Sequence, residues 1–247
     1  MNAKVIFITG AAKRIGAYTA KYLHQLGWNI VLHYNQSEQL AKQLCSELNA
    51  GREHSVKLVQ GKLDTIADAE LVAQQALKAY GRLDGLINNA SSFYPTPIGS
   101  ISGDDWTNLV GSNMQAPLFL AQQCYPMLKQ HKGVIINMVD IHAQQPLKNH
   151  TLYCMAKSAL LTMTKSLALE LAPDVRVNGI APGAILWPES ALNEQDKHVI
   201  LGQIPLQQLG SMRDIAQAIH FLLNAPYITG QIIAVDGGRS IASHAIA

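Results

Sequence analysis

The sequence has few cysteines. Its 247 residues include Cys45, Cys124 and Cys154, an odd number without the spacing of metal ligands. This composition argues against both a disulfide framework and a zinc site, so we expect reduced thiols and no bound metal. His142 and His150 also lack metal-ligand spacing, and we expect both on a loop surface.

Long apolar runs and an excess of one charge are lacking too. No run approaches the roughly 18–20 apolar residues that cross a bilayer. Charged residues are 15% of the chain and the formal net charge is +2, which is too little to favour a nucleic acid or a membrane surface as partner. The chain enters a strand-like run at Val5–Ile8 without the pattern of a secretory signal. We therefore expect a cytoplasmic protein that binds neither nucleic acid nor membranes.

What the sequence does have is a regular alternation of short apolar runs and longer amphipathic stretches. The runs have the length and β-branched content of buried strands: Val5–Ile8, Ile30–His33, Ser55–Val59, Gly85–Ile87, Val134–Met138, Val175–Ile180 and Ile232–Val235. The stretches between them predict helices, for example over Ala67–Tyr80, Asp104–Gln130, Tyr153–Leu171 and Ser211–Leu223. Ser211 and Asp214 have the spacing of a capping-box variant at the start of the last of these helices.

This alternation predicts one domain over residues 1–247. Strands that alternate with helices form a parallel sheet with helices on both faces, so we expect a seven-stranded, doubly wound α/β sheet of the Rossmann type. The segment 184–205, with two prolines and Trp187, departs from the alternation. It predicts either a substrate lid or an ordinary surface insertion.

The turn after the first strand predicts a dinucleotide site. The run Thr9-Gly10-Ala11-Ala12-Lys13-Arg14-Ile15-Gly16 ends that strand and opens the first helix. Small residues there let backbone N–H groups approach a pyrophosphate, whose charge the helix N-terminus favours. The alternative is that Lys13 and Arg14 are only solvated turn residues.

The end of the second strand favours NADPH over NADH. A site for NADH commonly has Asp or Glu here to bind the ribose hydroxyls. This chain has His33 instead. The absence of a carboxylate removes a repulsion of the 2′-phosphate, and Lys13, Arg14 and Ser37 can add charge or hydrogen bonds to it.

Tyr153 and Lys157 form the candidate catalytic pair. They are four residues apart on a predicted helix, so both project from one face. A tyrosine has a pKa of about 10, and a nearby ammonium group stabilises the phenolate and lowers that pKa. Such a pair can exchange a proton with a substrate while a nicotinamide exchanges a hydride. The spacing alone occurs by chance in many helices, where it marks only surface.

Other motifs accompany this pair. Asn88 and Asn89 end the fourth strand, where two amides can tie neighbouring strand ends together, and Ala90 and Ser91 clear space beside a coenzyme. Together with the glycine turn and the Tyr153/Lys157 pair, in this order, they resemble the short-chain dehydrogenase/reductase family from end to end.

The resemblance implies an NAD(P)-dependent oxidoreductase and assigns further residues. Asn113 would hold a proton-relay water, Pro182-Gly183 would flank the nicotinamide, and Lys157 would also bind the nicotinamide ribose. Asp236-Gly237-Gly238 matches the C-terminal signature of the family. The resemblance also implies a homotetramer built on the long helices after the fourth and fifth strands.

Asp140 departs from the family's tetrad of Asn, Ser, Tyr and Lys. It stands thirteen residues before Tyr153, where the family has Ser. A serine hydroxyl donates a hydrogen bond to a carbonyl oxygen, whereas an ionised Asp would repel the growing oxyanion. An Asp suits an electron-poor C=N or amino-substituted heterocycle, whose N–H groups need an acceptor and whose ring nitrogen needs a proton. A protonated Asp could still serve a carbonyl, so both substrate classes stay open.

Several stretches resemble the pteridine reductases specifically. They are Asn88-Asn89-Ala90-Ser91-Ser92-Phe93-Tyr94-Pro95-Thr96-Pro97, Thr9–Gly16 with its Arg14, His33-Tyr34, Gln145-Pro146-Leu147 between Asp140 and Tyr153, and Glu170-Leu171-Ala172-Pro173. The resemblance implies that Phe93 stacks on a pterin and sandwiches it against the nicotinamide. It departs at Gln36, where the family often has a basic residue, and at Lys62-Leu63-Asp64, where an Asp-Leu pair frames adenine.

The candidate residues fall into three sets. The catalytic set is Asn113, Asp140, Tyr153 and Lys157. The coenzyme set is Gly10, Lys13, Arg14, Ile15, Gly16, His33, Tyr34, Asn35, Ser37, Leu63, Asn89, Ala90, Ser91, Tyr153, Lys157, Pro182 and Gly183. The substrate set is Arg14, Ser91, Phe93, Asp140, Tyr153 and Trp187.

Three functions follow. The first is NADPH-dependent reduction of a dihydrobiopterin- or dihydromonapterin-type pterin, with biopterin and dihydrofolate as further substrates, to the tetrahydro form. The second is reduction of a ketone by a carbonyl reductase of the same superfamily, against which Asp140 and Phe93 argue. The third is a non-catalytic NADP-binding regulator, against which the Tyr153/Lys157 pair argues.

Overall fold

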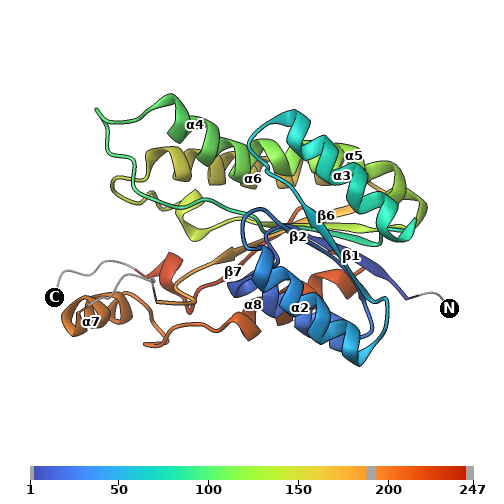
Figure 1. Cartoon of the computed structure of the whole chain (residues 1–247). Coiled ribbons are helices and arrows are strands. Elements are labelled where there is room, and N and C mark those ends of the chain that lie inside the picture. The colour runs from blue at the N-terminus through green and yellow to red at the C-terminus, as the bar shows by residue number, and fades with distance from the viewer. Residues whose placement is uncertain (1–2, 188–192, 243–247) are drawn as a thin grey trace.

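A computed structural model of the chain describes residues 3–187 and 193–242 and confirms the α/β architecture (Figure 1). Within these residues the sheet has seven parallel strands, in the order β3-β2-β1-β4-β5-β6-β7. The strands are β1 (Val5–Ile8), β2 (Asn29–Tyr34), β3 (Val56–Gln60), β4 (Gly85–Asn88), β5 (Val134–Met138), β6 (Arg176–Pro182) and β7 (Ile232–Val235). Each of them lies within two residues of its predicted run.

Helices connect these strands and cover both faces of the sheet. They are α1 (Arg14–Gln25), α2 (Glu38–Gly51), α3 (Ile66–Tyr80), α4 (Gly103–Val110), α5 (Ala116–Gln130), α6 (Thr151–Glu170), α7 (Glu194–Gly202) and α8 (Met212–Asn224). Short turns of helix are η1 (Gly111–Gln115), η2 (Ile141–Ala143) and η3 (Arg239–Ile241). In the described part of the chain, none of the helices combines the length and apolarity that crossing a bilayer requires.

Alternating side chains of the strands build two cores. Ile6 and Ile8 of β1 pack with α1, α2 and α8 on one face, and Val5 and Phe7 pack with α3, α5 and α6 on the other. Figure 1 shows these two helical layers above and below the sheet. All four side chains are almost inaccessible to solvent, as expected for a parallel sheet covered on both faces.

The predicted helix over Asp104–Gln130 has the right extent but is not regular. It consists of α4, the π-helical turn η1 and α5. Two local features explain the interruption. Pro117 has no N–H to continue the helical hydrogen bonds. A Cβ on Gly111 would lie 2.7 Å from the carbonyl oxygen of Asp64, so the helix passes directly against the loop after β3.

The strand order reverses between β1 and β4. β2 and β3 extend from β1 on one side, and β4 to β7 extend on the other. In doubly wound sheets the loops at the carboxyl ends of the two strands beside such a reversal diverge and leave a crevice for a ligand. The glycine turn follows β1 and the Asn88-Asn89 pair closes β4, so both border this crevice.

Candidate active site

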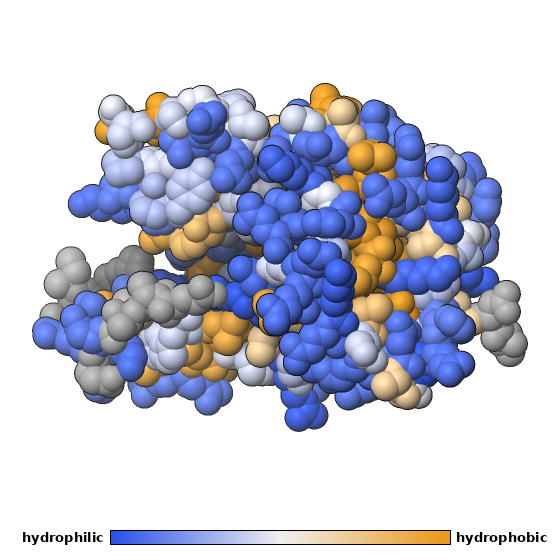
Figure 2. All heavy atoms as spheres, in the orientation of Figure 1, coloured by the Kyte–Doolittle hydropathy of each residue, from blue (hydrophilic) through white to orange (hydrophobic). Residues whose placement is uncertain are grey.

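Two adjoining cavities occupy the crevice. The larger has a volume of about 690 Å³ and the smaller one of about 290 Å³. Residues lining both are Arg14, Ile15, Asn89, Ser91, Phe93 and Tyr153. Figure 2 shows the surface hollowed between the upper and lower helical layers. The shared lining makes the two cavities one continuous cleft.

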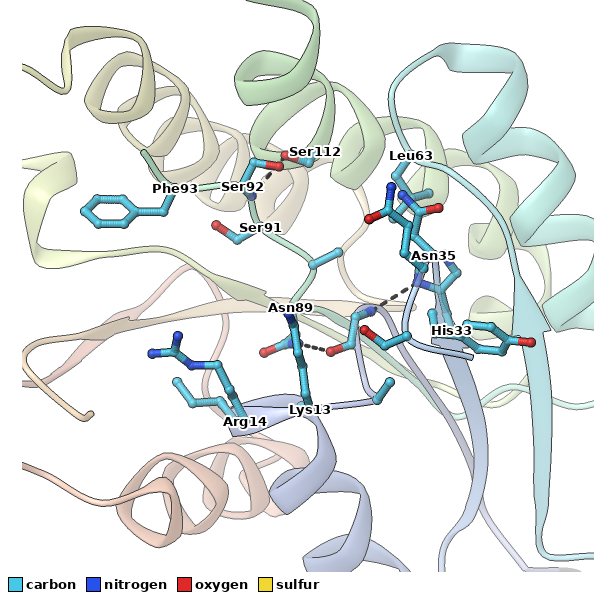
Figure 3. Close-up of a pocket in the computed structure, with 18 of the residues that line it drawn as sticks. Lys13, Arg14, His33, Asn35, Leu63, Asn89, Ser91, Ser92, Phe93 and Ser112 are labelled. Carbon is cyan, nitrogen blue, oxygen red and sulfur yellow. Dashed lines mark hydrogen bonds between the residues drawn. The ribbon is translucent and has the colours of Figure 1, made fainter. Parts of the chain in front are cut away.

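The glycine turn packs so closely against its neighbours that two of its positions have no room for a side chain. Gly10 has a φ of +61°, and a Cβ there would lie 2.9 Å from the Cα of Ala90. A Cβ on Gly16 would lie 2.4 Å from the carbonyl oxygen of Gly10. Arg14 adopts a φ of +53°, a left-handed conformation that a glycine usually takes. The turn is therefore a tight backbone cradle whose long side chains, Lys13 and Arg14, line the cleft (Figure 3).

The asparagine pair ties the strand ends together, as the sequence predicted. The Asn89 amide donates a hydrogen bond to the carbonyl oxygen of Thr9 at 2.8 Å and another to that of Gly10 at 3.1 Å, and Figure 3 shows the second. The Asn88 amide donates to the Asn137 side chain on β5, at 2.8 Å. These bonds hold the glycine turn at a fixed place relative to β4.

His33 is a neutral, buried part of the cleft wall. Its Nδ1 accepts a hydrogen bond from the Gly10 N–H and its Nε2 bonds the carbonyl oxygen of Gly61, each at 3.1 Å. Burial lowers the pKa of His33 to about 4. His33 therefore brings no positive charge to a phosphate at neutral pH, but it fixes the glycine turn and leaves the end of β2 free of a carboxylate.

The structure gathers the coenzyme set around this cleft. The larger cavity is lined by Gly10, Lys13, Arg14, Ile15, Gly16, His33, Tyr34, Asn35, Ser37, Leu63, Asn89, Ala90, Ser91 and Tyr153. The smaller is lined by Lys157, Pro182 and Gly183, among others. A tight glycine turn at the start of a helix, beside a cavity lined by two basic side chains, fits a dinucleotide.

The carboxyl of Asp140 and the phenol of Tyr153 are in direct contact. The Tyr153 hydroxyl donates a hydrogen bond to Asp140 Oδ2 at 2.7 Å. The other oxygen, Oδ1, accepts from the backbone N–H of His142 at 2.8 Å. Both side chains line the smaller cavity, so the predicted pairing of an acidic group with a phenol is present in the cleft.

The pKa of Tyr153 differs from the expectation based on Lys157. Burial and the Asp140 carboxylate hold the pKa of Tyr153 well above its usual range. The lowering predicted from the sequence was therefore wrong for this state of the protein, because desolvation and the neighbouring negative charge both disfavour phenolate. Tyr153 is consequently a protonated phenol at neutral pH, in the form that can donate a proton.

Lys157 is fully buried beneath this pair. Its Nζ donates a hydrogen bond to the carbonyl oxygen of Met138 at 2.7 Å and lies 5.6 Å from the centre of the Tyr153 ring. Burial lowers the pKa of Lys157 to about 8, and the Asp140 carboxylate opposes this shift. The ammonium group is thus held next to the tyrosine at a cost in desolvation, which is unusual for a purely structural lysine.

Phe93 lies at the mouth of the cleft with two aromatic neighbours. Its ring stacks on His150, with centroids 4.8 Å apart and planes 14° apart, and meets Tyr153 edge-on at 4.8 Å. Sequence reasoning placed His150 on a loop surface and missed this contact. The signal was its position three residues before Tyr153, which puts the two residues on one side of the start of α6.

Two predicted residues do not line the described cleft. Asn113 is completely buried in η1, where its amide donates to the carbonyl oxygens of Ser92 and Leu109 and its Oδ1 accepts from the Ser91 hydroxyl at 2.7 Å. It positions Ser91 instead of facing the cavity. Trp187 lies beside α7, where Lys197 Nζ is 6.0 Å from its ring centre.

Several lining residues escaped sequence reasoning. Ser92, Asn108 and Ser112 border the larger cavity, and Ile185 and Leu186 border the smaller. Gln36 and Asp64, named from the sequence only as departures from the family pattern, border the larger cavity too. Asn108 and Ser112 lie on α4 and η1, far in sequence from the motifs. No local pattern marks them, because their proximity arises only when α4 packs over the loop after β4.

Comparisons with known proteins agree with this geometry. A family model described as enoyl-(acyl carrier protein) reductase matches residues 10–240. The chain is 37% identical to pteridine reductase 1 of Leishmania tarentolae, with 97% of each chain covered. It is 34% identical to 7alpha-hydroxysteroid dehydrogenase of Bacteroides fragilis, with 96% of this chain and 95% of that one covered.

A third relative is named for a different substrate from the first two. The chain is 31% identical to 3-oxoacyl-[acyl-carrier-protein] reductase of Staphylococcus aureus, with 95% of this chain and 97% of that one covered. The family match, over residues 10–240, includes the Tyr153/Lys157 pair and most of the glycine turn. The chain belongs to the short-chain dehydrogenase/reductase family of oxidoreductases, whose members use NAD(P)H.

Proposed function

We propose that this protein is an NADPH-dependent reductase of pterins. The observation that carries the proposal is the 2.7 Å hydrogen bond between the Tyr153 hydroxyl and the Asp140 carboxyl. The substrates would be dihydrobiopterin- or dihydromonapterin-type pterins, with biopterin and dihydrofolate as further candidates. The product would be the tetrahydro form, reached from a dihydropterin or dihydrofolate in one reduction and from biopterin in two, with one NADPH consumed in each.

The proposed chemistry follows from where the acidic and phenolic groups point. The bound coenzyme would supply a hydride to a ring carbon of a C=N bond. Tyr153, protonated at neutral pH, donates its proton to the adjacent ring nitrogen, so that one hydride and one proton are added across the bond. Asp140 accepts hydrogen bonds from the amino-substituted ring and, through its contact with Tyr153, supports return of a proton to the phenol.

The coenzyme would lie along the larger cavity. The glycine turn would hold its pyrophosphate against backbone N–H groups at the start of α1. Lys157 would bind the nicotinamide ribose, and Pro182-Gly183 would flank the nicotinamide. NADPH is favoured because no carboxylate ends β2, while Lys13, Arg14 and Ser37 line the cavity there.

Substrate would enter between the nicotinamide site and Phe93. Phe93 is 55% exposed at the cleft mouth, and because one face of its ring stacks on His150, a planar heterocycle would stack on the other face. Arg14 and Ser91 line both cavities and would contact coenzyme and substrate together. We propose the segment 184–205, with Trp187, as the lid over this side; residues 188–192 lie outside the described part of the chain.

Reduction of a ketone is the second candidate. The steroid dehydrogenase and 3-oxoacyl reductase relatives, at 34% and 31% identity, favour it. For a ketone, Asp140 would have to be protonated so that it could donate to the carbonyl oxygen. The two candidates therefore differ in the charge they require at one carboxyl group.

A substrate panel tests the proposal directly. NADPH oxidation by the purified protein would be followed with dihydrobiopterin, dihydromonapterin, biopterin and dihydrofolate, and in parallel with 3-oxoacyl and steroid ketones. We expect turnover of at least one pterin, with kcat/KM at least tenfold above that of any ketone. Turnover of ketones alone, or of neither class, would contradict the pterin assignment.

The Asp140→Ser variant tests the carboxyl itself. Serine restores the family's usual tetrad, so we expect pterin turnover to fall by a factor of about 10² and ketone turnover to rise, because the hydroxyl can donate to an oxyanion. The dissociation constant of NADPH, measured by fluorescence titration, is expected to stay within about twofold and so to show that the fold is intact. Equal pterin turnover in the variant and the parent would remove the reason to prefer pterins.

We also propose that the protein is cytoplasmic and forms a homotetramer through its long helices. The homotetramer is supported by exposed apolar side chains on α4, α5 and α6, namely Trp106, Leu118, Met155 and Leu169. A chain burying these side chains against copies of itself would remove apolar surface from water.

A further inference from the structure

The loop that carries Asp140 is tied to the far C-terminal turn of the chain. The Gln145 side-chain amide donates a hydrogen bond to the carbonyl oxygen of Ser240, a residue 95 positions later. The Gln145 backbone carbonyl in turn bonds Nδ1 of His142 at 2.8 Å. The backbone N–H of His142 donates to Asp140 Oδ1 at 2.8 Å. One continuous series of contacts therefore joins Ser240 to the carboxyl that meets Tyr153.

The C-terminal turn that receives Gln145 is itself held rigidly. The Asp236 carboxylate accepts hydrogen bonds from the N–H groups of Gly238, at 2.9 Å, and Ser240, at 2.7 Å. Gly237 and Gly238 have φ values of +64° and +87°, which few other residues could adopt. The turn consequently offers the Ser240 carbonyl oxygen at a fixed place.

The same turn also packs against the end of β6 and the segment after α7. A Cβ on Gly183, in the segment proposed to flank the nicotinamide, would lie 2.6 Å from the Cβ of Asp236. A Cβ on Gly238 would lie 3.0 Å from Pro205, at the end of the proposed lid. Arg239 donates to the Gln203 side chain, just after α7, at 2.8 Å. The turn thus contacts the Asp140 loop, the β6 end and the lid segment at once.

We propose that Gln145 is a positioning residue for Asp140, acting through the turn Asp236–Ile241. The loop from Asp140 to Gln145 contains only the three-residue turn η2, which the Asp140 carboxyl caps and which Ser158 of α6 holds at the Ala143 carbonyl oxygen. Gln145 is the residue of this loop whose side chain reaches the C-terminal turn. Anchoring Gln145 to Ser240 holds His142, and the His142 N–H holds Oδ1, so that Oδ2 stays directed at Tyr153. This inference rests on the catalytic role proposed for Asp140.

The test uses Gln145→Met, which keeps the length of the side chain and removes its donor. Gln144→Met is the matched control, because Gln144 is the neighbouring, solvent-exposed glutamine. We expect kcat for the best substrate of the panel to fall about tenfold in Gln145→Met with KM and NADPH affinity nearly unchanged, since a small misplacement of one reacting group is enough for such a loss. Gln144→Met should match the parent.

Two further readouts separate positioning from general damage. Hydrogen–deuterium exchange should become at least tenfold faster at the His142 amide in Gln145→Met, whereas amides of β5 should keep their parent rates. The pH profile of kcat should also shift, because Asp140 faces Tyr153, Lys157 and the His142 backbone. Gln145→Glu should lose activity near neutral pH and regain part of it at low pH, where a protonated carboxyl can again donate.

The outcomes test the positioning role of Gln145 separately from the pterin function. Unchanged His142 exchange and an unchanged pH profile in Gln145→Met would overturn the positioning role, whichever substrate is used. A parallel loss of NADPH affinity and of protection in β5 would overturn it as well, since the effect would then be a general loosening. Faster exchange at His142 in a protein whose parent form reduces only ketones would support the anchor and reject the pterin function.

Discussion

At the scale of single residues, the site is governed by desolvation. Tyr153 and Lys157 are both buried, and burial pushes each toward its neutral form: the pKa of Tyr153 rises and that of Lys157 falls to about 8. Asp140 is the only carboxyl among the residues that line the smaller cavity, and it contacts the phenol directly. The site is therefore prepared to donate a proton, which is what a reductase needs.

Lys157 should carry a measurable cost in stability. Its folded-state pKa of about 8 lies below the ordinary value of 10.5, so between these values the unfolded chain binds more protons and stability rises with pH. Below pH 8 both states are protonated and the full cost remains. Lys157→Met should raise the Tm at pH 7, by roughly 2–4 °C for each kcal/mol recovered, and abolish turnover.

Thermal unfolding as a function of pH measures this effect. The Tm advantage of Lys157→Met over the parent should shrink as the pH rises from 8 toward 10. Lys165→Met, an exposed lysine on the same helix, is the matched control and should show no such trend. A variant that is less stable than the parent at pH 7 would mean that the hydrogen bond to Met138 outweighs the desolvation of the charge.

At the scale of elements, the coenzyme cradle depends on how closely α1 approaches the strand ends. Gly16 is in the first turn of α1, and its missing side chain lets the helix meet Gly10 and Asn89. The same contact brings the N-terminus of the helix to the crevice. The shape of the cradle therefore depends on the packing of α1 against Gly10 and Asn89 as well as on the conformation of the turn.

Gly16→Ala should break the cradle. The added Cβ would lie 2.4 Å from the Gly10 carbonyl oxygen and 2.7 Å from the Asn89 amide, so backbone must move. We expect the dissociation constant of NADPH to rise at least tenfold by isothermal titration, and the protein to unfold at a lower temperature. Gly51→Ala, at the end of α2 where nothing lies within 4 Å of the added Cβ, should leave binding unchanged. Equal affinities in the two variants would contradict the cradle.

At the scale of the whole molecule, two helical layers enclose the sheet, and one of them carries exposed apolar side chains on α4 and α6. Leu169 on α6 is 84% exposed, and Trp106 on α4 and Met155 on α6 are about half exposed. α4 and α6 pack against each other, so these side chains belong to one layer of the molecule (Figure 1). Self-association through this layer is the consequence we test.

Light scattering after gel filtration should give a mass of four chains of 26.8 kDa. Leu169→Glu would bring a charge into the proposed interface and should shift the protein to smaller species at micromolar concentration. Leu40→Glu is the control, because Leu40 is 48% exposed on α2, in the other helical layer. A monomeric parent protein, or equal dissociation of both variants, would reject the proposed assembly.

The sequence by itself determined the architecture and most of the cleft. Apolar runs of strand length alternate with amphipathic stretches, and this periodicity is local, so the strands were predicted to within two residues. The glycine turn, Asn88-Asn89, Asp140 and Tyr153/Lys157 each follow a strand or open a helix. Parallel strands end at one edge of a sheet, so these motifs had to meet there.

Only the tertiary structure decided the state of the catalytic groups and their supports. A spacing of four residues predicts that Lys157 is near Tyr153. The pKa of Tyr153, however, depends on how deeply the phenol is buried and on its contact with Asp140, and both are set by how the chain packs. The stacking of His150 on Phe93, the burial of Asn113 behind Ser91 and the bond from Gln145 to Ser240 are likewise contacts between distant segments. Desolvation and long-range hydrogen bonds exist only after the chain has packed, so no local pattern encodes them.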